Sequence, residues 1–157
     1  MEKSGIIFLG ILSILVIVVA VSGCTGGSKQ YSDARVSFSY PENWNISDQY
    51  NTKTYVTFKA QPSELIEGEV SSYTLQPGET IEGYIAKSNR NFSAPKTLNG
   101  YTFYNSSETD PTDERIVYNE GMFVKDGVVY NIVINGNTAI GDVNGAYNNI
   151  TQSFRIK

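Results

Sequence analysis

The sequence of 157 residues contains no histidine and only one cysteine, Cys24. The absence of histidine removes the commonest general base and the commonest metal ligand of proteins. A single cysteine excludes a disulfide within the chain, and a zinc site built from thiolates needs more than one. The chain also lacks the Gly-X-Ser-X-Gly motif of serine hydrolases. We therefore predict a protein that is not an enzyme, with no catalytic, cofactor-binding or metal-binding residues.

Basic residues are also scarce. Lysine and arginine number 12 against 16 aspartate and glutamate residues, which gives a formal net charge of −4 at pH 7. Without a basic face, the chain is not expected to bind the phosphates of nucleic acid. The most acidic stretch, residues 108–114, lacks the Asp-X-Asp-X-Asp-Gly order of a calcium loop. We interpret this stretch as a solvated turn.

The longest apolar run lies near the N-terminus, over Ile6–Val21. It ends in Val-Ser-Gly-Cys, which resembles a lipobox because small residues precede the cysteine. The pattern predicts a lipoprotein signal peptide over residues 1–23, lipid on Cys24, and a flexible tether over residues 24–31. The alternative is an uncleaved anchor, because the 19 residues from Gly5 to Gly23 are just long enough to span a bilayer. Both interpretations make the membrane a partner and place the remaining chain at the outer face of the cytoplasmic membrane.

Beyond the tether, alternation of apolar and polar residues predicts β-strands. The clearest strands are Val36–Tyr40, Lys53–Ala60 and Glu69–Leu75. Asn99-Gly100 and Asp126-Gly127 are strong turn dipeptides, so we expect an antiparallel hairpin around each. The paired strands are 96–98 with 101–107, and 115–125 with 128–135.

Two segments have the periodicity of an amphipathic helix. The first runs from Ile81 toward Phe92, with Thr80 as its N-cap. The second covers residues 139–153, with Thr138 as its N-cap and an apolar stripe of Ile140, Val143, Tyr147, Ile150 and Phe154. This order of elements predicts one α+β domain over residues 32–157. We expect an α-β-α sandwich, in which the helices cover both faces of a twisted antiparallel sheet.

The stretch Val-Ser-Phe-Ser-Tyr-Pro-Glu-Asn-Trp at Val36–Trp44 resembles the opening of PsbP-like domains. In these domains alternating aromatic residues precede a proline, two polar residues and a tryptophan. The order of the strands and the closing helix agree with the resemblance, which covers about residues 31–157. The family includes extrinsic photosynthetic subunits and microbial lipoproteins, so the resemblance implies the sandwich fold and the binding of other proteins rather than a reaction.

Tyrosine is abundant, with 11 residues that all follow Cys24. Tyr55, Tyr104 and Tyr118 fall opposite the core residues of their strands. They are candidates for a partner surface, and the alternative is that the helix on the second face covers them. Four Asn-X-Ser/Thr triplets are candidate N-glycosylation sites, although an asparagine-rich chain also produces such triplets by chance: Asn45, Asn91, Asn105 and Asn149.

Three classes of function fit these observations. The first, which we favour, is a membrane-anchored, extracytoplasmic, non-catalytic module that binds or assembles with another protein. The second is a surface protein that binds a small ligand such as a glycan or a lipid. The third is a structural component of the cell envelope, for which use of the glycosylation triplets would be the main indication.

Overall fold

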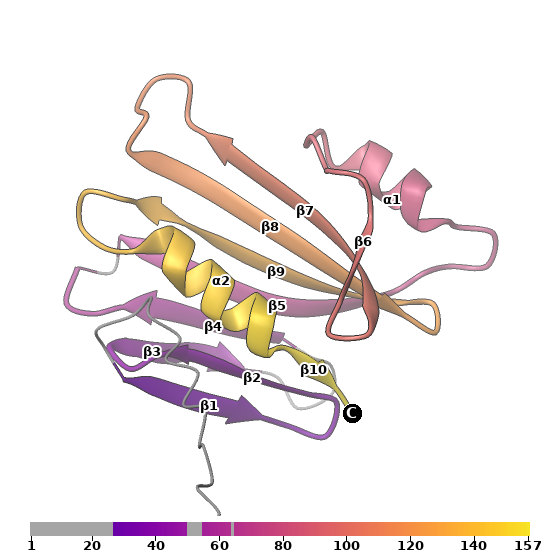
Figure 1. Cartoon of the computed structure of the whole chain (residues 1–157), viewed down its shortest axis with the longest axis horizontal. Coiled ribbons are helices and arrows are strands. Elements are labelled where there is room, and N and C mark those ends of the chain that lie inside the picture. Colours follow the sequence, from indigo (N-terminus) through magenta and orange to yellow (C-terminus); the bar gives the residue numbers. More distant parts are fainter. Residues whose placement is uncertain (1–26, 50–54, 64) are drawn as a thin grey trace, which may run out of the picture.

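The computed structural model describes residues 27–49, 55–63 and 65–157 of the chain. Within these residues, a main sheet of seven strands has the spatial order β3-β4-β5-β9-β8-β7-β6, and all neighbouring strands are antiparallel (Figure 1). The strands are β3 (Trp44–Gln49), β4 (Tyr55–Ala60), β5 (Ile66–Thr74), β6 (Lys96–Leu98), β7 (Tyr101–Thr109), β8 (Ile116–Lys125) and β9 (Val128–Asn137). The predicted α+β class, with a mostly antiparallel sheet and two helices, is confirmed.

A smaller sheet of order β1-β2-β10 consists of β1 (Ser28–Ser32), β2 (Val36–Pro41) and β10 (Arg155–Ile156). The side chain of Tyr31 in β1 is 9% exposed, and its ring stacks on Phe38 with centroids 5.0 Å apart. The predicted tether over residues 24–31 is therefore wrong for residues 28–31. The folded domain begins at Ser28 rather than at residue 32, because β2 provides the backbone partner for a segment that has no strand pattern of its own.

Both predicted hairpins of the main sheet are present. Asn99 and Gly100 have φ values of 56° and 85°, and Asp126 and Gly127 have 51° and 76°. Two consecutive residues with positive φ form the tight turn whose twist suits antiparallel strands, and Asn-Gly and Asp-Gly accept this conformation readily. The turn dipeptides thus determine the register of both hairpins.

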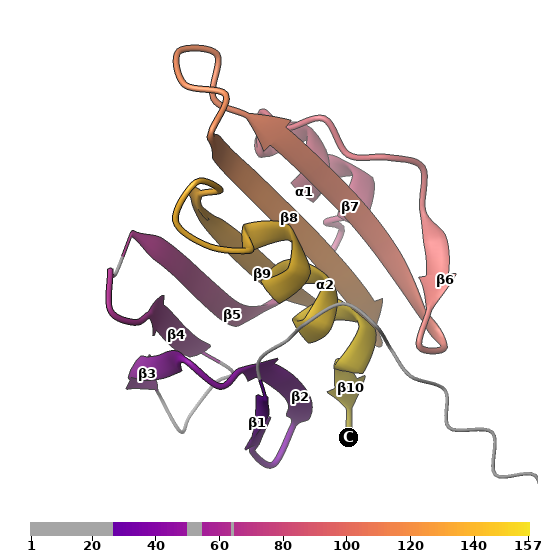
Figure 2. The same cartoon turned by 60° about the vertical axis from the view of Figure 1, so that its left-hand side comes forward.

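Helix α2 (Val143–Ser153) packs on one face of the main sheet, together with the smaller sheet (Figures 1 and 2). Its N-cap is Asp142, whose Oδ1 accepts a hydrogen bond from Gly145 N at 2.7 Å. The prediction that the helix begins at 139 after a Thr138 cap is wrong, because Thr138 Oγ1 instead donates to the carbonyl of Arg115 at 3.0 Å. Ile140 consequently lies before the helix and is 45% exposed.

Helix α1 (Ile81–Lys87) lies on the opposite face, as Figure 2 shows. Thr80 caps it as predicted, because its Oγ1 accepts from Gly83 N at 3.1 Å. The helix ends earlier than the apolar periodicity suggests, since Asn89 adopts a left-handed φ of 55° directly after the C-cap. Phe92 lies beyond the helix but still packs with it on the sheet.

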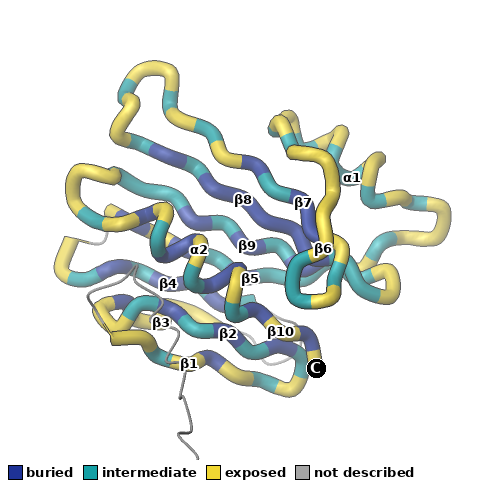
Figure 3. The backbone as a smooth tube through the Cα atoms, in the orientation of Figure 1, coloured by how far each residue is buried: buried dark blue, intermediate teal, exposed yellow. Residues whose placement is uncertain are grey.

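The two faces of the main sheet are covered to different extents, and Figure 3 shows the buried residues along the strands. In β8 the five consecutive residues 119–123 are buried, because α2 covers one face of this strand and the α1 region covers the other. In β4 only alternate residues are buried, so just one of its faces lies against the core. Most of the β3-β4-β5 half of the second face therefore remains uncovered by α1, which reaches the C-terminal end of β5, where Tyr84 stacks on Tyr73 with ring centroids 5.1 Å apart.

Candidate functional site

The uncovered half of the second face is a continuous polar and aromatic surface, which we call the open face. The strand register aligns Lys59, Glu67, Asn135 and Tyr118 in one cross-strand row. Thr57, Glu69 and Val133 form the next row. Most of these residues are half-buried and Glu67 is exposed, and the pair Lys59 Nζ–Glu67 Oε1 is 4.0 Å apart. We define the open face by these two rows together with Ser47, Tyr55, Leu65 and Ile116.

Two shallow hollows follow one another along the open face. The first, of about 320 Å³, lies over β3, β4, β5 and β9. The second, of about 430 Å³, lies between Leu65, Ile116 and Tyr118. Glu67 and Asn135 line both hollows, so the two form one surface rather than separate sites. Leu65 is 64% exposed, the highest value among the large hydrophobic residues that the structure describes as exposed.

Tyr118 is held by a charged cluster beside the second hollow. The guanidinium of Arg90 lies 5.7 Å from the centroid of the Tyr118 ring, and Arg90 Nε is 3.0 Å from Glu120 Oε2. The other carboxylate oxygen of Glu120 accepts from Asn131 Nδ2 at 3.0 Å. Glu120 is 7% exposed, and burial raises the pKa of its carboxyl above the ordinary value. The cluster contacts one side of the Tyr118 ring at the border of the open face.

The register places all three predicted tyrosines on the second face but does not bring them together. Tyr104 is 7% exposed and packs with Met122 and Val129 beneath the α1 region, so its prediction as part of a partner surface is wrong. Tyr55 and Tyr118 are both half-buried; they are three strand spacings apart across the sheet and four residues apart along the strands, which together make about 20 Å. Sequence periodicity gives the face of a strand residue, but only the position of α1 determines which part of that face is covered.

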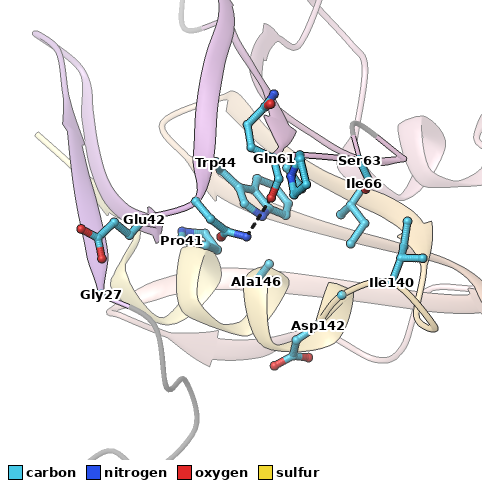
Figure 4. A pocket seen from close by; sticks show the side chains of 14 residues that line it. Gly27, Pro41, Glu42, Trp44, Gln61, Ser63, Ile66, Ile140, Asp142 and Ala146 are labelled. Atoms are coloured by element: carbon cyan, nitrogen blue, oxygen red, sulfur yellow. Dashed lines mark hydrogen bonds between the residues drawn. The ribbon is translucent and has the colours of Figure 1, made fainter.

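A deeper cleft of about 610 Å³ lies at one end of the sandwich, where three loops meet (Figure 4). Trp44, Ile66 and Ala146 form its floor, and the loops contribute Asn43 and Ile140 among others. Its size suits a small molecule. However, Asn43 Nδ2 already donates to the carbonyl of Gln61 at 3.4 Å, and the carboxylate of Asp142 caps α2. Two of the polar side chains in the described lining are therefore already engaged within the fold.

The four glycosylation triplets occupy different environments. Asn45 and Asn91 are exposed. Asn105 Oδ1 accepts from the Tyr147 hydroxyl at 2.6 Å beneath α2. Asn149 Oδ1 is buried and has no hydrogen-bond partner. Asn45 and Asn91 are thus accessible in the folded domain, whereas Asn105 and Asn149 are half-buried.

The acidic stretch at 108–114 uses its carboxylates within the chain. Asp110 Oδ1 accepts from the backbone and hydroxyl of Thr112, and Asp113 pairs with Arg115 at 2.8 Å. These hydrogen bonds hold the pKa of Asp110 and of Asp113 below their usual range. Over residues 27–49, 55–63 and 65–157, no group of three or more acidic, cysteine or histidine side chains is placed to hold a metal ion.

The predicted signal or anchor segment and Cys24 lie outside the described residues. In the part of the chain that the structure describes, no helix combines the length and the apolar character needed to cross a bilayer. The predictions for residues 1–23 and for Cys24 therefore remain predictions.

Comparison with known proteins relates the chain to others through its fold. No protein-family model and no curated protein sequence matches it. Among solved structures, the cyanobacterial PsbP protein CyanoP from Synechocystis superposes with a TM-score of 0.60 at 14% identity, over 87% of this chain and 96% of CyanoP. A protein from Bacteroides thetaiotaomicron superposes with a TM-score of 0.56 at 13% identity, over 85% of this chain but only 49% of its own length. The domain therefore has a PsbP-like fold.

Proposed function

We propose that this protein is a non-catalytic module that binds another protein at the outer face of the cytoplasmic membrane. The single observation that carries the proposal is the open face, a continuous surface on which Tyr118 and the exposed Leu65 border one hollow. Tyrosine combines a large apolar area with a polar hydroxyl and few rotatable bonds, and it is frequent among the residues that dominate protein interfaces. The surrounding amide and charged side chains supply the polar rim of such an interface.

The properties of Tyr118 support this assignment. A contact residue that is already fixed loses less conformational entropy on binding. The Tyr118 ring lies against Arg90, which is itself paired with the buried Glu120. Tyr118 is therefore pre-organised, and we regard it as the centre of the contact and Tyr55, about 20 Å away on the same face, as peripheral.

The absence of a catalytic role rests on the available side chains. The sequence contains no histidine, and its one cysteine precedes the folded domain. The most buried carboxylate, Glu120, is engaged by Arg90 and Asn131. The PsbP-like fold is compatible with a binding module, since a fold by itself specifies no reaction.

The membrane attachment is also part of the proposal. Lipid on Cys24, or an uncleaved N-terminal anchor, holds the domain at the membrane surface. Intact-mass measurement of protein extracted from membranes should show the loss of residues 1–23 and the mass of an added lipid, and Cys24→Ala should abolish that mass. A mature protein that still begins at Met1 would contradict lipidation and leave the anchor.

Chemical crosslinking of membranes, followed by affinity purification of this chain, tests protein binding. We expect Tyr118→Ala to weaken recovery of the partner by about tenfold or more, as for a central contact residue, and Tyr55→Ala to weaken it less. Leu65→Ser should also weaken it. Ile46→Ser is the matched control, because Ile46 is also exposed (38%) but pairs with the core-facing Phe58 and lies outside the open face.

Undiminished partner recovery with both Tyr118→Ala and Leu65→Ser would contradict the assignment of the open face. Turnover of a peptide, glycan or phosphate ester that one carboxylate substitution abolishes would overturn the non-catalytic role.

A further inference from the structure

The folded domain begins very close to the proposed membrane attachment. Strand β1 starts at Ser28, and the carbonyl of Gly27 already accepts a hydrogen bond from Glu42 N at 2.9 Å. Only Thr25 and Gly26 separate Cys24 from Gly27. Three residue steps span at most about 11 Å, so a lipid on Cys24 holds Gly27 within that distance of the bilayer surface. An uncleaved anchor that ends near Gly23 imposes nearly the same limit.

Gly27 lines the cleft at the end of the sandwich, and this fixes which end of the domain is near the membrane. The loop that follows β2, the loop between β4 and β5, and the loop between β9 and α2 meet at this end (Figures 1 and 4). The last two loops are adjacent, because a Cβ placed on Gly141 would lie 2.6 Å from Ile66 Cδ1. The strands then run away from the cleft toward the opposite end of the domain.

The same end carries an exposed apolar side chain that is not buried in the core. Ile140 is 45% exposed at the rim of the cleft, directly before the Asp142 cap of α2. The exposed Pro62 lines the same cleft, in the loop between β4 and β5. Glu42 and Asp142 are the charged residues among the described cleft lining, so the lining itself offers no cation to anionic lipids. Two cations lie beside it: Lys29, whose Nζ is 3.0 Å from the carbonyl of Trp44, and the exposed Arg115, whose carbonyl contacts Thr138.

We propose that the cleft end of the domain docks on the bilayer, with Ile140 in the interfacial region of the lipid. This inference rests on the membrane attachment in the proposed function. Burial of apolar surface stabilises the contact, and the short connection to the anchor gives it a high effective concentration. Because the cleft lining contains no cation, we expect the apolar contact to form without anionic lipid. The hollow beside Tyr118 then lies near the membrane, so the partner is itself a membrane-bound or membrane-embedded protein.

Fluorescence quenching of the full-length protein in phosphatidylcholine vesicles tests the orientation. An environment-sensitive thiol probe is placed at Ile140→Cys, and a matched probe at the exposed Gln76→Cys, beyond the opposite end of β5. Unsubstituted protein gives the background from Cys24. We expect the probe at position 140 to be severalfold less accessible to aqueous iodide than the probe at position 76, and to be quenched by doxyl-labelled lipid. High salt should not change either result.

Equal iodide access at the two positions would overturn the orientation, and so would failure of the protein to float with the vesicles. The apolar contact would be overturned if protection of the probe at position 140 from iodide required anionic lipid or was lost in high salt. These outcomes are distinct from failure of the proposed protein binding. That binding is measured by crosslinked recovery of a partner and depends on Tyr118, whereas the vesicles contain no partner.

Discussion

Replacing glycine by alanine should have opposite effects at two positions of this domain. Gly121 lies in β8 beneath α2, where a Cβ would be 2.5 Å from the Tyr147 hydroxyl and 2.8 Å from a ring carbon of Phe103. Gly121→Ala therefore forces both aromatic side chains to move. Such overpacking costs about 1–3 kcal/mol. Loss of the hydrogen bond from Tyr147 to Asn105 adds about 1 kcal/mol.

Gly83 lies on the exposed side of α1, and the nearest atom to an added Cβ is Thr80 Oγ1 at 3.4 Å. Here alanine only reduces the conformational freedom of the unfolded chain, so Gly83→Ala should stabilise the domain by about 0.5–1 kcal/mol.

Urea and thermal unfolding of the polypeptide 28–157, followed by circular dichroism, measures both effects. We expect Gly121→Ala to lower the free energy of unfolding by about 2–4 kcal/mol, and the midpoint temperature by roughly 10 °C. In the Gly121→Ala background, Tyr147→Phe should recover part of the loss because it removes the hydroxyl that a Cβ would meet. An unchanged or raised midpoint temperature for Gly121→Ala would refute the packing of α2 over β8. Destabilisation by Gly83→Ala would instead contradict the exposed position of Gly83 in α1.

Three further predictions concern the stability of the same polypeptide. Trp44 is 3% exposed, so Trp44→Ala should cost about 3–5 kcal/mol in urea unfolding, and a loss under about 1 kcal/mol would contradict its burial. A polypeptide that starts at Asp33 lacks β1 and the stacking of Tyr31 on Phe38. Its free energy of unfolding should therefore be lower than that of the polypeptide 28–157 by about 2 kcal/mol or more. Equal stabilities would show that β1 contributes nothing. Burial raises the pKa of Glu120 above its unfolded value, so its ionisation opposes folding: the penalty is absent below the unfolded pKa and grows as the pH rises toward the folded pKa. Glu120→Gln should therefore flatten the pH dependence of stability in this range, and an unchanged profile would contradict the assignment.

The features that were predictable from the sequence are those that neighbouring residues determine. Asn99-Gly100 and Asp126-Gly127 form their turns because their own backbone preferences select positive φ. Thr80 caps α1 through a residue three positions later in the chain. These interactions join residues that are close in the chain, so a short stretch of sequence is enough to predict them.

The incorrect predictions concern features that depend on contacts with a segment distant in the sequence. Thr138 and Asp142 are both acceptable N-caps, and the choice between them follows from the bond of Thr138 to Arg115, on another loop. Tyr104 and Tyr118 have the same orientation relative to the sheet, but only Tyr104 lies beneath the α1 region. The position of α1 over β7–β9 and the C-terminal end of β5, rather than over β3 and β4, depends on tertiary packing that no periodicity reveals. The sequence therefore predicts which strand residues point toward the second face of the sheet. It does not predict which part of that face is left exposed.

The start of the domain shows how such an error alters the functional conclusion. Residues 24–31 are rich in glycine and polar side chains, which favours a flexible tether. Pairing with β2 overrides this preference, because each backbone hydrogen bond to β2 and the burial of Tyr31 compensate for the lost chain entropy. Under the proposed membrane attachment, a tether of eight residues would let the domain rotate freely above the membrane, whereas the shortened connection would restrain the cleft end to its surface. Under the same proposal, the pairing of one short strand determines how closely the open face is held to the membrane.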